Sequence, residues 1–207
     1  MMEDRILYGI NNFLEDNFFL PFSDSYKLEE KSESGKSELQ VDIQGDNLCS
    51  EDYDHKGKCN FLRKNSSFKL QRSVDHVLLQ KKGDKWILHL IEMKSKVDDK
   101  KWHQIKEKIR ASYFNVRALE AVLGIHIDEV KVYTTYEDTG FWKADGSEDP
   151  KIIAAPLGKP IPPMADEEWE NNTIHVDVGE LVEFQHTAVK MQRTEDKSKL
   201  IGKLSID

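Results

Sequence analysis

The chain has 207 residues, of which 38% are hydrophobic and 33% are charged, and its formal net charge is −8. This length suits one domain, or one domain with an elaboration. No apolar run approaches the roughly 20 residues that a membrane-spanning helix needs, and the acidic, amphipathic start is not typical of a secretory signal, so we expect no membrane association.

The first part of the chain predicts a helix followed by a long polar segment. Apolar residues recur at helical spacing over residues 2–16, and Pro21 prevents the helix from continuing. Residues 23–60 are rich in Ser, Gly, Asp, Glu and Lys, and within them only ELQVDIQ, residues 38–44, alternates like a strand. We therefore expect a polar insertion at about 23–60, most of it loop.

The middle of the chain predicts a hairpin and a helix. Residues 75–94 form two extended runs around the turn signal Lys82-Gly83-Asp84, and the second run is apolar enough to be buried on both faces. Asp98 or Asp99 can cap a helix start. Apolar residues then keep helical spacing as far as Gly124, which is a suitable helix stop.

The remaining segments complete a mixed pattern. Residues 128–136 predict a strand, residues 155–164 are proline-rich and expected at the surface, and residues 172–190 predict a strand and a short helix, followed by a polar tail. This order indicates an α/β (α+β) fold with a central mixed β-sheet flanked by helices. We expect a core over 1–150 and a C-terminal extension, 151–207, packed on or following it.

Two cysteines, Cys49 and Cys59, lie in a polar segment. They are predicted to be free thiols in a reducing compartment, so we expect a cytoplasmic protein. The alternative is a metal site that also uses His55, but no second ligand pair at zinc-like spacing follows.

Charged residues gather where the buried hairpin ends. Alternation along the second strand puts Glu92 and Lys94 on one face, and the hairpin register brings Asp75 opposite the same strand end. Two adjacent carboxylates beside a lysine suit Mg²⁺ or Mn²⁺, with the backbone carbonyl of Met93 as a further ligand. Lys94 would then activate a water or stabilise charge in a transition state. The alternative is a structural salt bridge between Lys94 and either acid.

This sequence order resembles the PD-(D/E)xK nuclease superfamily, which includes restriction endonucleases, recombination exonucleases and junction resolvases. The resemblance covers about residues 1–136, although valine stands where the family has proline before the first acid. It implies a restriction-endonuclease-like core, with Asp75 and Glu92 as metal ligands and Lys94 as the catalytic lysine.

The resemblance also suggests accessory residues. Members often add a glutamate from the first helix, and Glu3 is the candidate, with an ordinary first-turn acid as the alternative. Gln104 occupies the place of a helix residue that other members use, but the glutamine-then-tyrosine spacing of the recombination exonucleases is missing. Candidate phosphate contacts, or else a solvated helix face, are Lys96, Lys100, Lys101 and Lys108.

Basic charge surrounds this motif. Residues 56–117 hold 17 Lys and Arg against 6 Asp and Glu, a local excess that suits an enzyme acting on a polyanion. Three nearby histidines are expected to be core or surface residues, because a ββα-type metal nuclease needs a different residue order; they are His76, His89 and His103.

The leading interpretation is a Mg²⁺- or Mn²⁺-dependent nuclease that hydrolyses DNA. One alternative is a catalytically silent nucleic-acid-binding or assembly protein on the same fold, and another is an unrelated soluble interaction domain. The sequence leaves the choice of DNA or RNA and of end or internal cleavage open. Cutting both strands with one site calls for a homodimer or for two successive nicks.

Overall fold

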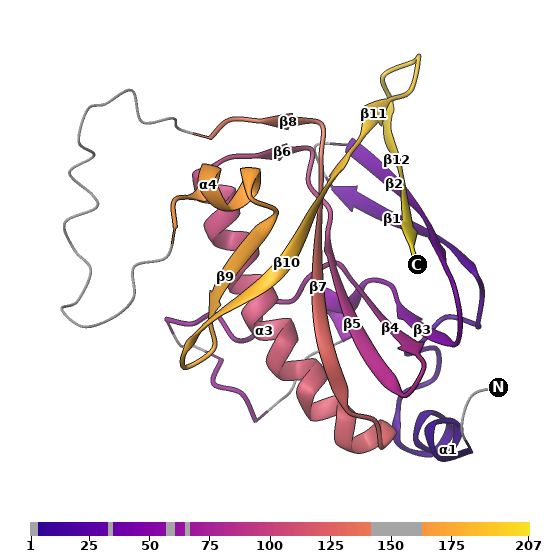
Figure 1. The fold of residues 1–207 in the computed structure, drawn as a ribbon. Helices are drawn as coiled ribbons and strands as arrows, with labels where there is room; N and C mark the ends of the chain where they lie inside the picture. Colours follow the sequence, from indigo (N-terminus) through magenta and orange to yellow (C-terminus); the bar gives the residue numbers. More distant parts are fainter. Residues whose placement is uncertain (1–3, 33–34, 57–60, 65–66, 142–162) are drawn as a thin grey trace.

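Two β-sheets and a layer of helices build the fold, as the computed structural model of the chain shows (Figure 1). The structure describes the chain except for residues 1–3, 33–34, 57–60, 65–66 and 142–162. Glu3, Cys59 and most of the proline-rich stretch therefore lie outside the described residues. Within the described part, the architecture is α+β, with a mixed central sheet flanked by helices.

The strands of the described part form a central sheet, an outer sheet and a short pair. The central sheet has the order β3-β4-β5-β7-β10-β9 and the outer sheet β1-β2-β12-β11, while β6 pairs with β8. The first eight strands are β1 Ser25–Ser32, β2 Gly35–Ile43, β3 Asn47–Ser50, β4 His76–Lys82, β5 Lys85–Glu92, β6 Lys96–Val97, β7 Ile127–Tyr136 and β8 Asp138–Thr139. The last four are β9 Thr173–Asp177, β10 Leu181–Lys190, β11 Gln192–Arg193 and β12 Lys199–Ile206. The helices are α1 Asp4–Phe13, α2 Tyr53–Lys56, α3 Asp99–Leu123 and α4 Ala165–Glu170.

The predicted hairpin and helix are confirmed. β4 and β5 pair antiparallel around Gly83, whose φ of 64° suits the turn. Asp98 caps α3, because its side chain accepts a hydrogen bond from the Lys101 backbone N–H. Gly124 ends the helix in the left-handed conformation, with φ 67°. β7 then returns parallel to β5, so α3 is the crossover between these two strands.

The outer sheet corrects the expectation of a mostly unstructured insertion. Residues 23–60 contain β1, β2 and β3, of which only the β2 region was predicted. Apolar residues that alternate along β1 and β2 are fully buried against the central sheet, among them Leu28, Leu39 and Val41. Polar residues fill the other positions of both strands, which is why composition alone favours a loop.

The C-terminal residues complete both sheets. Residues 172–190 form two strands, β9 and β10, so the predicted short helix is wrong. β10 lies parallel to β7, and its buried residues Phe184 and His186 alternate with exposed ones, as in a strand with one buried face. The expected polar tail is β12, which pairs parallel with β2.

Two apolar cores lie on opposite faces of the central sheet. The helices α1 and α3 cover one face, around Trp102, Ile105 and Ile109. The outer sheet covers the other face, around Tyr26, Leu28 and Ile91. Every residue of β5 after its first is buried, which confirms that this strand is enclosed on both faces.

Candidate functional site

The two predicted acids meet at the end of the hairpin. His76 pairs with Ile91 in the antiparallel register, so Asp75, one residue earlier, and Glu92, one residue later, lie opposite each other. The side chains are buried, with exposed fractions of 4% for Asp75 and 0% for Glu92. The sequence-predicted juxtaposition is therefore present.

Two lysines converge on these carboxylates. Lys94 Nζ lies 2.5 Å from Glu92 Oε1 and 3.6 Å from Asp75 Oδ2. Lys108 Nζ, from α3, lies 2.7 Å from Glu92 Oε1 and 2.9 Å from Asp75 Oδ1. Their side chains are 24% and 22% exposed, so both ammonium groups sit at the boundary between the buried acids and solvent.

Backbone hydrogen bonds hold the segment after β5 in place. The Met93 N–H donates to Asp75 Oδ2 at 2.7 Å, and the Met93 carbonyl accepts from Lys94 Nζ at 2.7 Å. The Thr135 hydroxyl, on the neighbouring strand β7, accepts from the Lys94 N–H and donates to the Lys94 carbonyl, at 2.9 Å and 3.1 Å. The Met93 carbonyl, which the sequence suggested as a further metal ligand, thus lies within hydrogen-bond distance of the Lys94 ammonium group.

Burial and charge act in opposite directions on the two acids. Burial, together with the negative charge of Asp75, raises the pKa of Glu92 to about 7, despite the two ammonium groups. Burial alone would raise the pKa of Asp75 as well, but Lys94, Lys108 and the Met93 N–H lower it below its ordinary value. Asp75 is thus the acid that the site keeps ionised most strongly.

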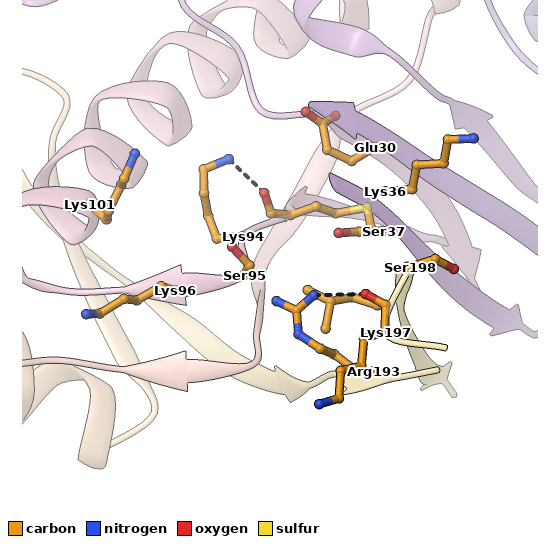
Figure 2. A pocket seen from close by; sticks show the side chains of 12 residues that line it. Glu30, Lys36, Ser37, Lys94, Ser95, Lys96, Lys101, Arg193, Lys197 and Ser198 are labelled. Carbon is orange, nitrogen blue, oxygen red and sulfur yellow. Dashed lines mark hydrogen bonds between the residues drawn. The ribbon is translucent and has the colours of Figure 1, made fainter. Parts of the chain in front are cut away.

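A third carboxylate near the site was not predicted. Glu30, on β1 of the outer sheet, lines a cavity together with Met93 and Lys94 (Figure 2). Burial and the negative charge of Asp75 raise the pKa of Glu30. Glu30 lies in the segment expected to be an insertion, and its place beside the hairpin depends on packing of the outer sheet.

The donor atoms fit a hard divalent cation. Asp75, Glu92 and the Met93 carbonyl offer oxygen ligands, which Mg²⁺ and Mn²⁺ prefer. The Glu92 carboxylate is fully buried; its Oε1 meets the ammonium groups of Lys94 and Lys108, and its Oε2 has no hydrogen-bond partner among the described residues. Over the described ranges, no cluster of three or more His, Cys, Asp and Glu side chains is placed to hold a metal ion, so such a cation would rely on carbonyl and water oxygens as well.

Two cavities flank the acids and share Lys94. The smaller, about 220 Å³, is lined by Glu92, Lys94, Gln104 and Lys108. The larger, about 410 Å³, extends from Met93 and Lys94 toward the outer sheet. Lys94 is therefore accessible from two sides, whereas Glu92 lines the smaller cavity and Asp75 is a lining residue of neither.

The other predicted site residues are placed as follows. Gln104 lines the smaller cavity, and Lys96 and Lys101 line the larger one, while Lys100 is exposed at the start of α3. Lys108, predicted as a phosphate contact, instead forms ion pairs with both acids.

The histidines and the described cysteine are not part of the acid cluster's donor set. His76 and His89 are buried and His103 is exposed, which agrees with the expectation of core or surface residues. His76 accepts a hydrogen bond from the Asp52 N–H at 3.4 Å, and His89 contacts Tyr133 and Gln80. Cys49 is a buried free thiol.

Comparison of the chain with protein-family models, with curated proteins and with solved structures finds no match. Among the helices of the described part, none is both long and apolar enough to cross a membrane.

Proposed function

We propose that this protein is a Mg²⁺- or Mn²⁺-dependent nuclease that hydrolyses phosphodiester bonds of DNA. The observation that carries the proposal is the convergence of Asp75, Glu92 and Lys94 at the end of one hairpin, with a backbone carbonyl between them. The order of hairpin β4–β5, helix α3 and parallel strand β7 supports a restriction-endonuclease-like core and the resemblance to the PD-(D/E)xK superfamily.

Each residue has a role that follows from its position. Asp75 and Glu92, with the Met93 carbonyl, would hold the divalent cation, which supplies Lewis-acid activation at the scissile phosphate when bound. Lys94 lies within reach of both acids and lines both cavities, so it can orient the attacking water and stabilise negative charge that develops on the phosphate. The buried setting of the acids strengthens these interactions, because less water screens them.

Binding of a divalent cation by the two acids would require Lys108 to leave this position. Its ammonium group contacts both of the carboxylates that would hold the cation. Two positive groups cannot share such a site without repulsion, so Lys108 would turn toward the smaller cavity that it lines. In that position its charge is available to a phosphate of the substrate, the role predicted from the sequence.

The same contact favours the second candidate function, a catalytically silent nucleic-acid-binding or assembly protein. Lys94 and Lys108 place two positive charges against the two carboxylates, so the acids have charged partners without any metal ion. Such a protein would bind DNA through its basic surface and keep the acids for stability.

Cleavage assays separate the two functions. Purified protein is incubated with linear, circular and single-stranded DNA in Mg²⁺, in Mn²⁺ or in EDTA. A nuclease cuts at least one of these substrates only with metal, and Asp75→Asn abolishes the cut while Asp84→Asn, at the distant hairpin turn, does not. DNA binding with no cleavage of any substrate in either metal would refute the nuclease and support the silent binding protein.

A further inference from the structure

We propose that the larger cavity beside Lys94 binds a single polynucleotide strand through its phosphates and leads it to Asp75 and Glu92. This inference rests on the proposed nuclease function and names the form of its substrate. One wall of the cavity comes from the outer sheet, which lies outside the hairpin, helix and strand that carry the family resemblance.

The cavity lies where the outer sheet meets the end of β5 (Figure 2). Glu30 and Lys36, from β1 and β2, lie on one side of it, and Lys96 and Lys101 lie on the opposite side. The turn between β11 and β12 supplies a further wall. Its volume is about 410 Å³, and the basic residues that line it are Lys36, Lys94, Lys96, Lys101, Arg193 and Lys197.

Most of this positive charge is not neutralised within the described protein. Lys36, Lys96, Lys101 and Lys197 form no ion pair with a described residue, and Glu30 is the acid among the lining residues. Arg193 differs, because its guanidinium is held by both oxygens of the Glu137 carboxylate, at 2.6 Å and 2.7 Å. Unpaired lysines around one cavity attract an anion with several charges.

The lining chemistry matches a phosphate backbone more closely than bases. Ser37 and Ser95 add neutral hydroxyl donors between the lysines, and Lys and Ser are both common contacts of phosphate oxygens. None of the described lining residues is aromatic, so bases have no ring to stack on. We therefore expect binding that is independent of sequence and falls with rising salt.

The size of the cavity favours one strand over a duplex. Its volume of about 410 Å³ lies in the range of small-molecule sites, about 300–1,000 Å³. A space of this size can take about one nucleotide unit of a strand at a time, whereas a B-form duplex, whose major groove alone is about 12 Å wide, is too large to enter it. The cavity therefore fits a single-stranded segment or a frayed end.

Lys94 lies between the larger cavity and the proposed catalytic acids. It lines both the larger cavity and the smaller one, which also contains Glu92, Gln104 and Lys108. A strand that leaves the larger cavity toward the smaller one passes Lys94 and the two acids. Its phosphate at that point lies where hydrolysis is proposed to occur.

The test is a binding measurement without cleavage. Fluorescence anisotropy in EDTA follows a labelled oligothymidylate of 15 nucleotides, an oligouridylate of the same length, and a blunt DNA duplex with the same number of phosphates, over a series of salt concentrations. The variants are Lys36→Gln, Lys197→Asn and the double variant; Asn suits the φ of 58° at residue 197. Lys85→Gln, at the far end of β5, is the control.

Wild-type protein should bind the thymidylate strand at least tenfold more tightly than the duplex. Each single variant should lower the logarithmic salt slope by about 0.7, the value for one phosphate contact on a single strand, and the double variant should lose about tenfold or more in affinity. Lys85→Gln should match wild type. Equal binding of the uridylate strand also supports a phosphate site, because no base or sugar contact is required.

Equal affinity for strand and duplex, or unchanged salt slopes in all three variants, would overturn the proposal. If the protein cuts no DNA in Mg²⁺ or Mn²⁺ but the variants show the expected salt slopes, the nuclease proposal is refuted and the strand site is supported. If the protein cuts DNA but the variants bind the strand like wild type, the nuclease proposal is supported and this cavity is not the strand site.

Discussion

The ammonium nitrogen of Lys108 lies 2.7 Å from Oε1 of Glu92, so the long helix α3 places a positive charge against a carboxylate that would hold a divalent cation. Lys108 also contacts Asp75, at 2.9 Å. Burial lowers and the two carboxylates raise the pKa of Lys108, and the net change is upward, so the lysine stays protonated at neutral pH. A cation that binds here has to displace this charge.

We expect Lys108→Gln to bind Mn²⁺ more tightly than wild type, by about tenfold, which corresponds to about 1.4 kcal/mol. The reason is that the metal no longer competes with the ammonium group. The same variant should unfold more easily without metal, because Asp75 and Glu92 lose a neutralising partner. Isothermal titration calorimetry and melting temperatures measure both effects. Equal or weaker Mn²⁺ binding would show that Lys108 does not occupy the cation position.

Glu92→Ala should weaken Mn²⁺ binding strongly. Two close carboxylates repel each other until a cation neutralises them, so both are needed for the site. Calorimetric titration of wild type and Glu92→Ala provides the measurement, with Asp84→Ala at the hairpin turn as the control. If wild type and Glu92→Ala bind Mn²⁺ equally, the acid pair is not the metal site.

Lys94→Ala should lower the DNA cleavage rate by about 100-fold or more, the scale seen when one preorganised stabilising donor is lost. DNA affinity should change little, because the other lysines of the cavity carry the phosphate contacts. Lys101→Ala is the control: it should weaken binding yet cut at the wild-type rate when DNA is saturating. If the melting temperature of Lys94→Ala is several degrees lower but its cleavage rate is that of wild type, Lys94 has a structural role in an ion pair and is not catalytic.

Glu168→Ala should destabilise the fold by about 3–5 kcal/mol, the range for breaking a buried ion pair. The fully buried Glu168 carboxylate accepts from Trp102 Nε1 and faces Lys106, both at 2.5 Å, and it also accepts from the His175 N–H at 2.9 Å. These contacts tie α4 and β9 to α3. Urea unfolding of Glu168→Ala and of the exposed-site variant Glu180→Ala tests this, and similar stabilities of the two would contradict it.

His186 should make the protein less stable in mild acid. Its ring packs against Trp102 and Trp169, its nitrogens make no hydrogen bond with a described residue, and burial lowers its pKa from 6.5 to about 3. Below pH 6.5 the unfolded state therefore takes up a proton that the native state does not. From pH 7 to pH 5 this costs about 2 kcal/mol of unfolding free energy.

The variant His186→Phe removes the imidazole that takes up a proton in the unfolded state, and it keeps an aromatic ring at the site. Its unfolding free energy should fall less than that of wild type between pH 7 and pH 5, measured by urea unfolding at both values. His126→Gln, at an exposed position, should follow wild type. Parallel declines of wild type and His186→Phe would mean that His186 is protonated in the native state.

The sequence by itself determined the parts of the site that depend on neighbours along the chain. The hairpin turn at Gly83 sets the register that brings Asp75 to Glu92, and the cap at Asp98 and the stop at Gly124 set the ends of α3. These signals are local, because turns, caps and short antiparallel pairings involve residues close in sequence. The candidate acids and Lys94 could therefore be predicted together.

Only the tertiary structure decided what surrounds them. The outer sheet exists because β2 pairs with β12, with partners such as Glu38 and Ile201, far apart in sequence, and this pairing buries the apolar side of strands whose polar composition resembles a loop. That packing places Glu30 beside the acids and Lys197 on the cavity wall. The contact of Lys108 with the acids has a similar origin. The angle at which a helix packs on a sheet depends on side chains of both elements, so a local sequence pattern does not predict it.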